Sequence, residues 1–246
     1  MKRLWIVVIL VILGSGVAVA AVKHQHAKGL RKPSHAQKGC VADLASCPDA
    51  GCGVGGDTRL NKKKNRKDIP AQVSYQPMTF EDFLHLEEER PTQWTTGQLR
   101  NEVEALGEDT PVALAGYLIG AHPGSPETCN CELSGEANND YHINLVERPG
   151  DRLWNSIVVE MTPRVRPSFP QWTLQNIQGL ITDINNPPLV RVSGYLLFDS
   201  QHVSRSGGPR ITIWEVHPVT KLEVCSGTDC TVDSDNGWQD IAQSAP

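Results

Sequence analysis

Four residues close together in the chain carry side chains that can do chemistry. Cys129 and Cys131 are separated by one residue, and Asp140 and His142 repeat that spacing shortly afterwards. Two thiolates and an imidazole can hold zinc or copper, and residues two apart on a strand project to one face. Cys129, Cys131 and His142 therefore form a candidate metal site. The usual zinc knuckle is Cys-x2-Cys, however, and each cysteine can instead bridge to the cysteines near the N-terminus, so we predict no cofactor.

Asp140 and His142 also have the residue types of a general acid–base pair. Polar residues at alternate positions are, however, what the solvent side of any strand shows, and we favour that interpretation. The chain has no Gly-x-Ser-x-Gly, His-Glu-x2-His, P-loop or Gly-x-Gly-x2-Gly motif. The sequence therefore predicts no catalytic residue.

The seven cysteines are typical of an oxidising compartment. Cys225 and Cys230 bracket a turn-like Ser-Gly-Thr-Asp loop, which predicts a local disulfide. Cys40, Cys47 and Cys52 lie in a Gly- and Pro-rich stretch that cannot build a core, so a disulfide there would compensate. An odd number leaves at least one cysteine unpaired, and the remaining connectivity stays open.

The N-terminus indicates export. The basic residues Lys2 and Arg3 precede an apolar stretch over residues 4–22, and Ala18-Val19-Ala20 has the form of a signal-peptidase site. The same stretch is long enough to cross a bilayer as an uncleaved helix. We expect residues 1–22 to be a signal peptide or a membrane anchor. The rest of the chain is then periplasmic or extracellular, either free or held at the inner membrane by its N-terminus.

The net charge of −5 conceals a division along the chain. Residues 22–70 hold eleven Lys and Arg against four acids (+7), and residues 71–246 hold ten against twenty-four (−14). A basic segment can be a tether near anionic lipid, an intramolecular clamp or a solubilising linker. We predict that residues 23–77 are a flexible basic linker with a cysteine cluster.

Periodicity divides the remainder into helices and then strands. Residues 78–107 predict two short helices, one with a capping box at Thr79 and Asp82 and one opening at Thr96 and ending at Gly107. Between residues 108 and 226, alternating apolar residues predict strands over 112–119, 140–146, 156–162, 189–198 and 210–224. Apolar residues at helical spacing predict one helix over 173–181. Gly116 and Gly194 predict bends within the first and fourth strands. Residues 227–246 form a C-terminal tail.

This order of elements resembles the OB-fold, a five-stranded Greek-key barrel with a helix between strands 3 and 4. The predicted class is mainly β, with two short helices before the barrel; a β-sandwich with a stray helix is the rival. Segments 128–131, 158–164 and 214–219 are also similar to those of uncharacterised bacterial exported proteins, a similarity that implies no activity.

In ligand-binding OB-folds, the face of strands two and three and the adjoining loops form the binding surface. The alternation of side chains along the third strand directs Glu160 outward on that face. Glu215 and His217 are an even number of residues from Ile211 and Ile213, so they are expected on the core side of the fifth strand. The resemblance implies this candidate surface: Asp140, His142, Glu160, His202, Arg205, Arg210 and Trp214.

We therefore expect a non-catalytic binding module of the cell envelope, with an envelope partner or an extracellular ligand. An exported hydrolase resembling a nuclease is the alternative, because OB barrels also carry staphylococcal-type nucleases. A nucleic-acid binder is a second alternative, but the acidic balance of the barrel region disfavours it.

Overall fold

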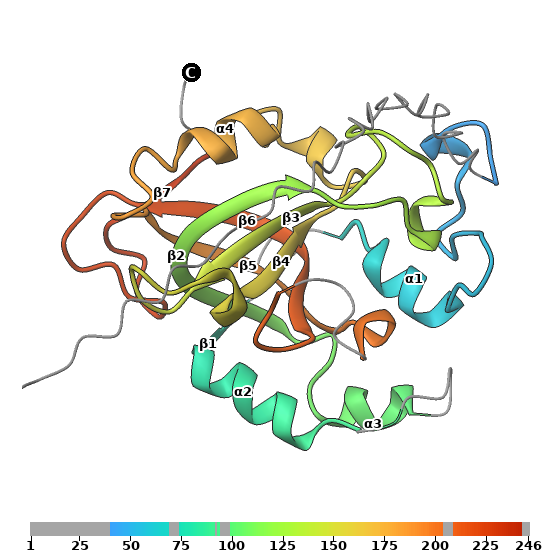
Figure 1. The fold of residues 1–246 in the computed structure, drawn as a ribbon, viewed down its shortest axis with the longest axis horizontal. Coiled ribbons are helices and arrows are strands. Elements are labelled where there is room, and N and C mark those ends of the chain that lie inside the picture. Colours follow the sequence, from blue (N-terminus) through green and yellow to red (C-terminus); the bar gives the residue numbers. More distant parts are fainter. Residues whose placement is uncertain (1–39, 69–73, 92, 94–98, 204–208, 243–246) are drawn as a thin grey trace, which may run out of the picture. The chain divides into compact units, whose positions relative to one another are not determined.

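Five strands with alternating apolar residues close into a barrel in the computed structural model, which describes residues 40–68, 74–91, 93, 99–203 and 209–242. Figure 1 shows the strands curving around a common core, with α4 on one side and α2 and α3 on the other. The helices and strands are α1 (Thr58–Lys64), β1 (Gln76–Met78), α2 (Phe80–Glu89), α3 (Arg100–Ala105), β2 (Pro111–Pro123), β3 (Tyr141–Val146), β4 (Ile157–Met161), α4 (Leu174–Gly179), β5 (Leu189–Phe198), β6 (Trp214–Cys225) and β7 (Trp238–Asp240).

The strand order is that of a closed Greek-key barrel. β2 pairs with β3 and β3 with β4, all antiparallel; β4 pairs with β6 in parallel; and β6 pairs with β5, which returns to β2. The helix α4 lies between β4 and β5 in the chain and buries Ile177 in the core. The predicted barrel with a helix between its third and fourth strands is confirmed.

Two short strands outside the barrel were not predicted. β1 pairs in parallel with the start of β2, and β7 pairs with the end of β6. Each has only three residues, too few for an alternation to be visible in the sequence. β7 lies in the predicted C-terminal tail, which folds back along the barrel after the Cys225–Cys230 disulfide.

The capping box predicted at Thr79 and Asp82 begins α2, which packs on the barrel. Phe80 and Phe83 are buried in the core, and the Leu86 carbonyl accepts a hydrogen bond of 3.0 Å from the indole of Trp214. α3 follows at Arg100; its predicted start at Thr96 lies outside the described residues, and Gly107 follows its end with φ +110°.

Residues 40–68 differ from the predicted flexible linker. They contain the helix α1, whose N-terminus is capped by the Asp57 carboxylate, and disulfides Cys40–Cys52 and Cys47–Cys131. The basic run of this segment, residues 62–67, therefore begins in the last turn of a helix that packs against the barrel. We call residues 40–68 the N-terminal cover.

The predicted signal or anchor over residues 4–22 lies outside the described residues. Within the described part of the chain, every helix is too short or too polar to cross a membrane. The three disulfides fit an oxidising environment.

Gly194 allows β5 and β6 to approach closely where their register shifts. A Cβ atom at this position would lie 2.3 Å from the carbonyl oxygen of Pro218, so one of the two strands would have to move. We expect Gly194→Ala to lower the free energy of unfolding by about 1–3 kcal/mol, measured by urea denaturation. Gly120→Ala is the matched control, because its Cβ would come no closer than 3.7 Å to a neighbouring atom. Equal losses for the two variants would refute this packing argument.

Candidate functional site

The registers of three adjacent strands gather acidic and histidine side chains on the outer face of the barrel. Inward residues of β3 and β4, such as Ile143 and Val159, lie in the core, so His142 and Glu160 point away from it. His142 is paired directly opposite Glu160 across β3 and β4. On the other side of β4, Val159 pairs with Val216 of β6, which places the neighbouring outward residues of β6 beside Glu160.

Glu160 is the centre of this arrangement. Its carboxylate lies 2.9 Å from His217 Nδ1 and 3.3 Å from His142 Nε2. His217 Nδ1 is also 3.2 Å from Glu215, which in turn pairs with Arg210 at 3.2 Å. Two strands thus supply histidines to opposite sides of one carboxylate.

The N-terminal cover and two loops complete the group. Lys64, at the end of α1, lies 2.8 Å from Glu127 and 3.6 Å from Asp199, and its side chain is only 1% exposed. Asp199 also contacts His202 Nδ1. We call the whole set the acid–histidine cluster: Lys64, Glu127, Asp140, His142, Glu160, Asp199, His202, Arg210, Glu215 and His217.

Most of the cluster is buried, contrary to the solvent-side interpretation of Asp140, and His142 is half-buried. Glu160 is 0% and Asp140 2% exposed. The faces that these residues occupy were predicted correctly for β3 and β4, but the N-terminal cover and the β2–β3 loop enclose them. Burial of polar residues on the outer side of a barrel therefore comes from chain segments outside the barrel strands.

Five members of the predicted surface are brought together: Asp140, His142, Glu160, His202 and Arg210. Arg205 lies outside the described residues. The prediction for Trp214 was wrong, because its ring lies in the core with its centroid 5.1 Å from that of Phe198.

Sequence reasoning missed Glu215 and His217 because it assigned them to the core side. The alternation was counted from Ile211 and Ile213, which precede β6, whereas the strand begins at Trp214. Trp214 and Val216 point inward, so Glu215 and His217 face Glu160. Lys64, Glu127 and Asp199 were also missed; each lies in a helix end or loop where periodicity gives no signal.

The predicted metal site at Cys129, Cys131 and His142 is not formed. Cys131 is bonded to Cys47 and cannot supply a thiolate. Cys129 is the free cysteine and is buried, with its sulfur 3.4 Å from Glu127 and 4.0 Å from Asp140. Burial raises the pKa of the Cys129 thiol well above its usual value, and the two carboxylates add to this effect.

Electrostatic interactions within the cluster shift several pKa values. Burial opposes the charge on Glu160, but His142, Lys64 and His217 outweigh it and hold the pKa of Glu160 well below its usual value. Burial also disfavours the imidazolium of His217, yet Glu160 and then Glu215 raise the pKa of His217 to about 10. Burial raises the pKa of Asp140 to about 6, against the opposing charge of His217. Protonated His217 thus compensates part of the acidic charge.

A surface pocket of about 310 Å³ reaches the edge of the cluster. Glu127 and His202 line it together with Val54, Glu132 and Gln201. Glu127 lies 4.0 Å from His142 Nε2, so it links the wall of the pocket to the histidine that faces Glu160.

Lys64 compensates the buried carboxylates of Glu127 and Asp199, and removing its charge takes one ion pair from each of them. We expect Lys64→Met to lower the free energy of unfolding by about 3–5 kcal/mol, measured by chemical denaturation at neutral pH. Lys62→Met, on the exposed side of the same helix, is the control and changes stability by less than about 0.5 kcal/mol. A Lys64→Met protein as stable as the wild type would show that Lys64 does not compensate these acids.

The raised pKa of His217 makes stability depend on pH. Its contribution is fully present below the unfolded-state value of about 6.5 and is lost as pH rises towards about 10, at up to about 1.4 kcal/mol per pH unit. We expect His217→Asn to flatten stability between pH 7 and pH 10, measured by denaturation with a chelator present. His202→Asn is the companion variant, since the pKa of His202 is also raised. An unchanged slope in His217→Asn would contradict the assignment.

Comparison with known proteins adds no assignment, because no family model matches the chain and no curated protein matches it significantly. The function is therefore inferred from the geometry of the acid–histidine cluster itself.

Proposed function

We propose that this protein is a non-catalytic binding module whose ligand is a divalent transition-metal ion held on the barrel by Asp140, Glu160 and His217. The observation that carries the proposal is the convergence of these three donors. Each offers one ligand atom, all of these atoms lie within 4.8 Å of one another, and all three residues are buried. Glu160 and His217 come from the adjacent strands β4 and β6, and Asp140 directly precedes β3, so the barrel supports all three donors.

The unsatisfied polar atoms of the cluster support a cationic ligand. His217 Nε2 is buried and makes no hydrogen bond with any residue that the structure describes. The cluster has five carboxylates, in Glu127, Asp140, Glu160, Asp199 and Glu215, against the permanent charges of Lys64 and Arg210. Protons on His202 and His217, whose pKa values are raised by neighbouring carboxylates, supply part of the balance in the absence of metal. A divalent ion would supply the same charge and give His217 a partner.

The donor types favour particular ions. Imidazole suits zinc, copper, iron and nickel, whereas carboxylates also suit manganese, magnesium and calcium. Two carboxylates with an imidazole therefore favour a transition-metal ion such as Zn²⁺ over Ca²⁺. Glu127, which lines the pocket, forms a second triad with His142 and Glu160.

Burial also favours a small ion over a macromolecular substrate. Glu160 and His217 are 0% and 1% exposed, so a phosphodiester cannot reach them without displacing the N-terminal cover. This disfavours the nuclease-like alternative. The nucleic-acid alternative loses support as well, because Lys63, Lys64, Arg66 and Lys67 of the basic run all pair with carboxylates of the chain.

The cellular setting is part of the proposal. We infer an exported protein of the periplasm or the extracellular space, with residues 1–22 as signal peptide or membrane anchor. The disulfides support an oxidising compartment, where Zn²⁺ has no redox chemistry of its own. An envelope partner or an extracellular ligand remains compatible with a module that binds metal.

The proposal is tested by zinc binding to the full chain. We expect the purified chain to bind one Zn²⁺ by titration calorimetry, with release of protons and tighter binding than Ca²⁺. A free zinc concentration about 100 times the Kd should add about 2.7 kcal/mol to the free energy of unfolding. Glu160→Gln and His217→Asn should each weaken zinc binding by more than about 100-fold, since each removes a direct ligand.

His85→Asn is the matched control for the histidine variant. His85 lies on α2, pairs with Glu89 and is largely exposed, so this change should leave zinc binding intact. Circular dichroism of each variant separates a lost ligand from a lost fold. Zinc binding that survives in both Glu160→Gln and His217→Asn, or that is absent from the folded wild type, would refute the proposed site.

A further inference from the structure

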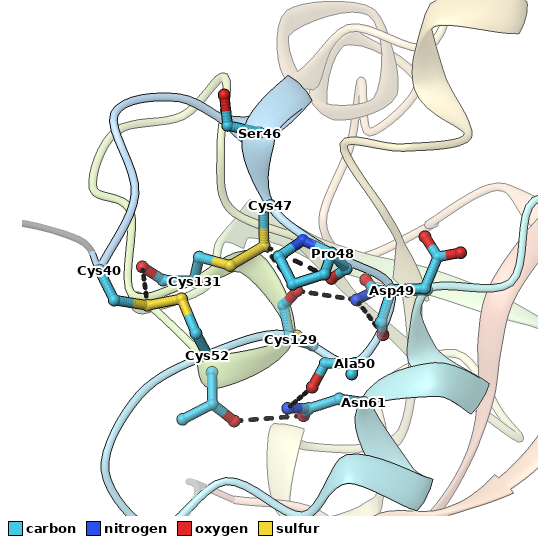
Figure 2. The surroundings of a disulfide bond; sticks show 12 residues. Cys40, Ser46, Cys47, Pro48, Asp49, Ala50, Cys52, Asn61, Cys129 and Cys131 are labelled. Carbon is cyan, nitrogen blue, oxygen red and sulfur yellow. Dashed lines mark hydrogen bonds between the residues drawn. A yellow bond between two sulfur atoms is a disulfide. The ribbon is translucent and has the colours of Figure 1, made fainter.

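Two disulfides lie side by side where the N-terminal cover meets the β2–β3 loop. Cys40–Cys52 lies at the surface, with Cys40 exposed and Cys52 half-buried. Cys47–Cys131 lies beneath it, with Cys131 0% exposed. The sulfur atoms of Cys40, Cys52 and Cys131 are all within 4.8 Å of one another, and Figure 2 shows the two bridges adjacent.

From this geometry we infer that the two bridges form a thiol–disulfide relay, in which an external dithiol that reacts at Cys40–Cys52 causes the buried Cys47–Cys131 bridge to open. The reductant is identified by its chemistry, as a protein or small molecule with two thiols. The inference is independent of the metal site, because no residue of the acid–histidine cluster takes part.

The relay has three steps. A thiolate of the dithiol attacks the exposed Cys40 sulfur, forms a mixed disulfide and releases the Cys52 thiolate. Cys52 attacks Cys131 Sγ, which forms Cys52–Cys131 and releases the Cys47 thiolate. The second thiol of the reductant then displaces Cys40, leaving an oxidised dithiol.

The atoms and electrons balance. The dithiol loses two electrons and two protons, and Cys40 and Cys47 end as thiols that have taken up those protons. The number of protein disulfides in this region falls from two to one. The buried bridge is thereby opened by a cysteine of the chain, although an external thiol cannot contact Cys131 directly.

Hydrogen bonds keep the sulfurs together during the exchange. Cys40 N donates to the Cys131 carbonyl at 3.0 Å, and Cys52 N donates to the Thr128 carbonyl at 2.9 Å. Asn65 Nδ2 donates to the Cys129 carbonyl at 2.8 Å, which fixes the end of α1 against the same loop. These contacts do not depend on the disulfides, so reduction of Cys40–Cys52 leaves Cys52 beside Cys131.

The remaining thiol does not compete in the exchange. Cys129 is 1% exposed, and its sulfur lies against the carboxylates of Glu127 and Asp140, at 3.4 and 4.0 Å, and not against either bridge. The exchange is therefore directed from the exposed bridge to the buried one. Its consequence is that the covalent tie between the N-terminal cover and the β2–β3 loop moves from Cys47 to Cys52, so that residues 40–51 are no longer held by a disulfide.

The test is disulfide mapping of the full chain after treatment with one equivalent of dithiothreitol, with free thiols alkylated on quenching. A protease that cleaves before aspartate separates the three N-terminal cysteines, because Asp43, Asp49 and Asp57 alternate with them. We expect a Cys52–Cys131 linkage with alkylated Cys40 and Cys47. Recovery of alkylated Cys40 and Cys52 with Cys47–Cys131 intact would overturn the relay.

A double variant provides the kinetic control. Cys40→Ser with Cys52→Ser removes the surface bridge but leaves Cys47–Cys131 in place, so we expect alkylation of Cys47 to slow by about tenfold or more. Alkylation of Cys47 as fast as in the wild type would mean that the dithiol reaches the buried bridge directly, and would also overturn the proposal. The wild-type mapping decides the question even if the double variant folds poorly.

Discussion

The burial of Glu160 among other carboxylates is the constraint on which the rest of the structure depends. Removing an ionised carboxylate from water is costly unless partners of opposite charge surround it. The barrel strands provide two histidines for Glu160, but the barrel alone leaves the neighbouring Glu127 and Asp199 without a lysine. Lys64 supplies that charge from outside the barrel. The N-terminal cover therefore encloses the cluster and also contributes to its charge balance.

The apolar alternation that builds the barrel also fixes the cluster. Because each strand has a period of two, directing Ile143, Val159 and Val216 into the core necessarily directs their polar neighbours outward. The pairing of β4 with β3 on one side and β6 on the other then places those neighbours around Glu160. The positions of Glu160 and His217 are thus maintained by the whole hydrophobic core, and Asp140 is held at the start of β3.

The sequence was informative where apolar residues recur at the spacing of a strand or a helix, or where a helix-capping pattern is present. The strand order, the α4 helix, the capping box of Thr79 and Asp82, and the turn disulfide Cys225–Cys230 could all be predicted. The side assignment of β6 failed because an apolar alternation before the strand was continued into it. Lys64 could not be predicted, since a lysine in a basic run gives no indication that a distant acidic cluster will bury it.

The N-terminal cover has little core of its own. Its apolar contacts form a small separate cluster around Cys47, Cys131 and Leu133, far smaller than the barrel core. A segment of this size depends on disulfides and ion pairs for its position. Both kinds of interaction respond to the surroundings, disulfides to thiols and ion pairs to protons and metal ions. The same segment thus carries both the two adjacent bridges and the lysine that pairs with the acid–histidine cluster, while the barrel strands that hold Glu160 and His217 stay fixed by their own packing.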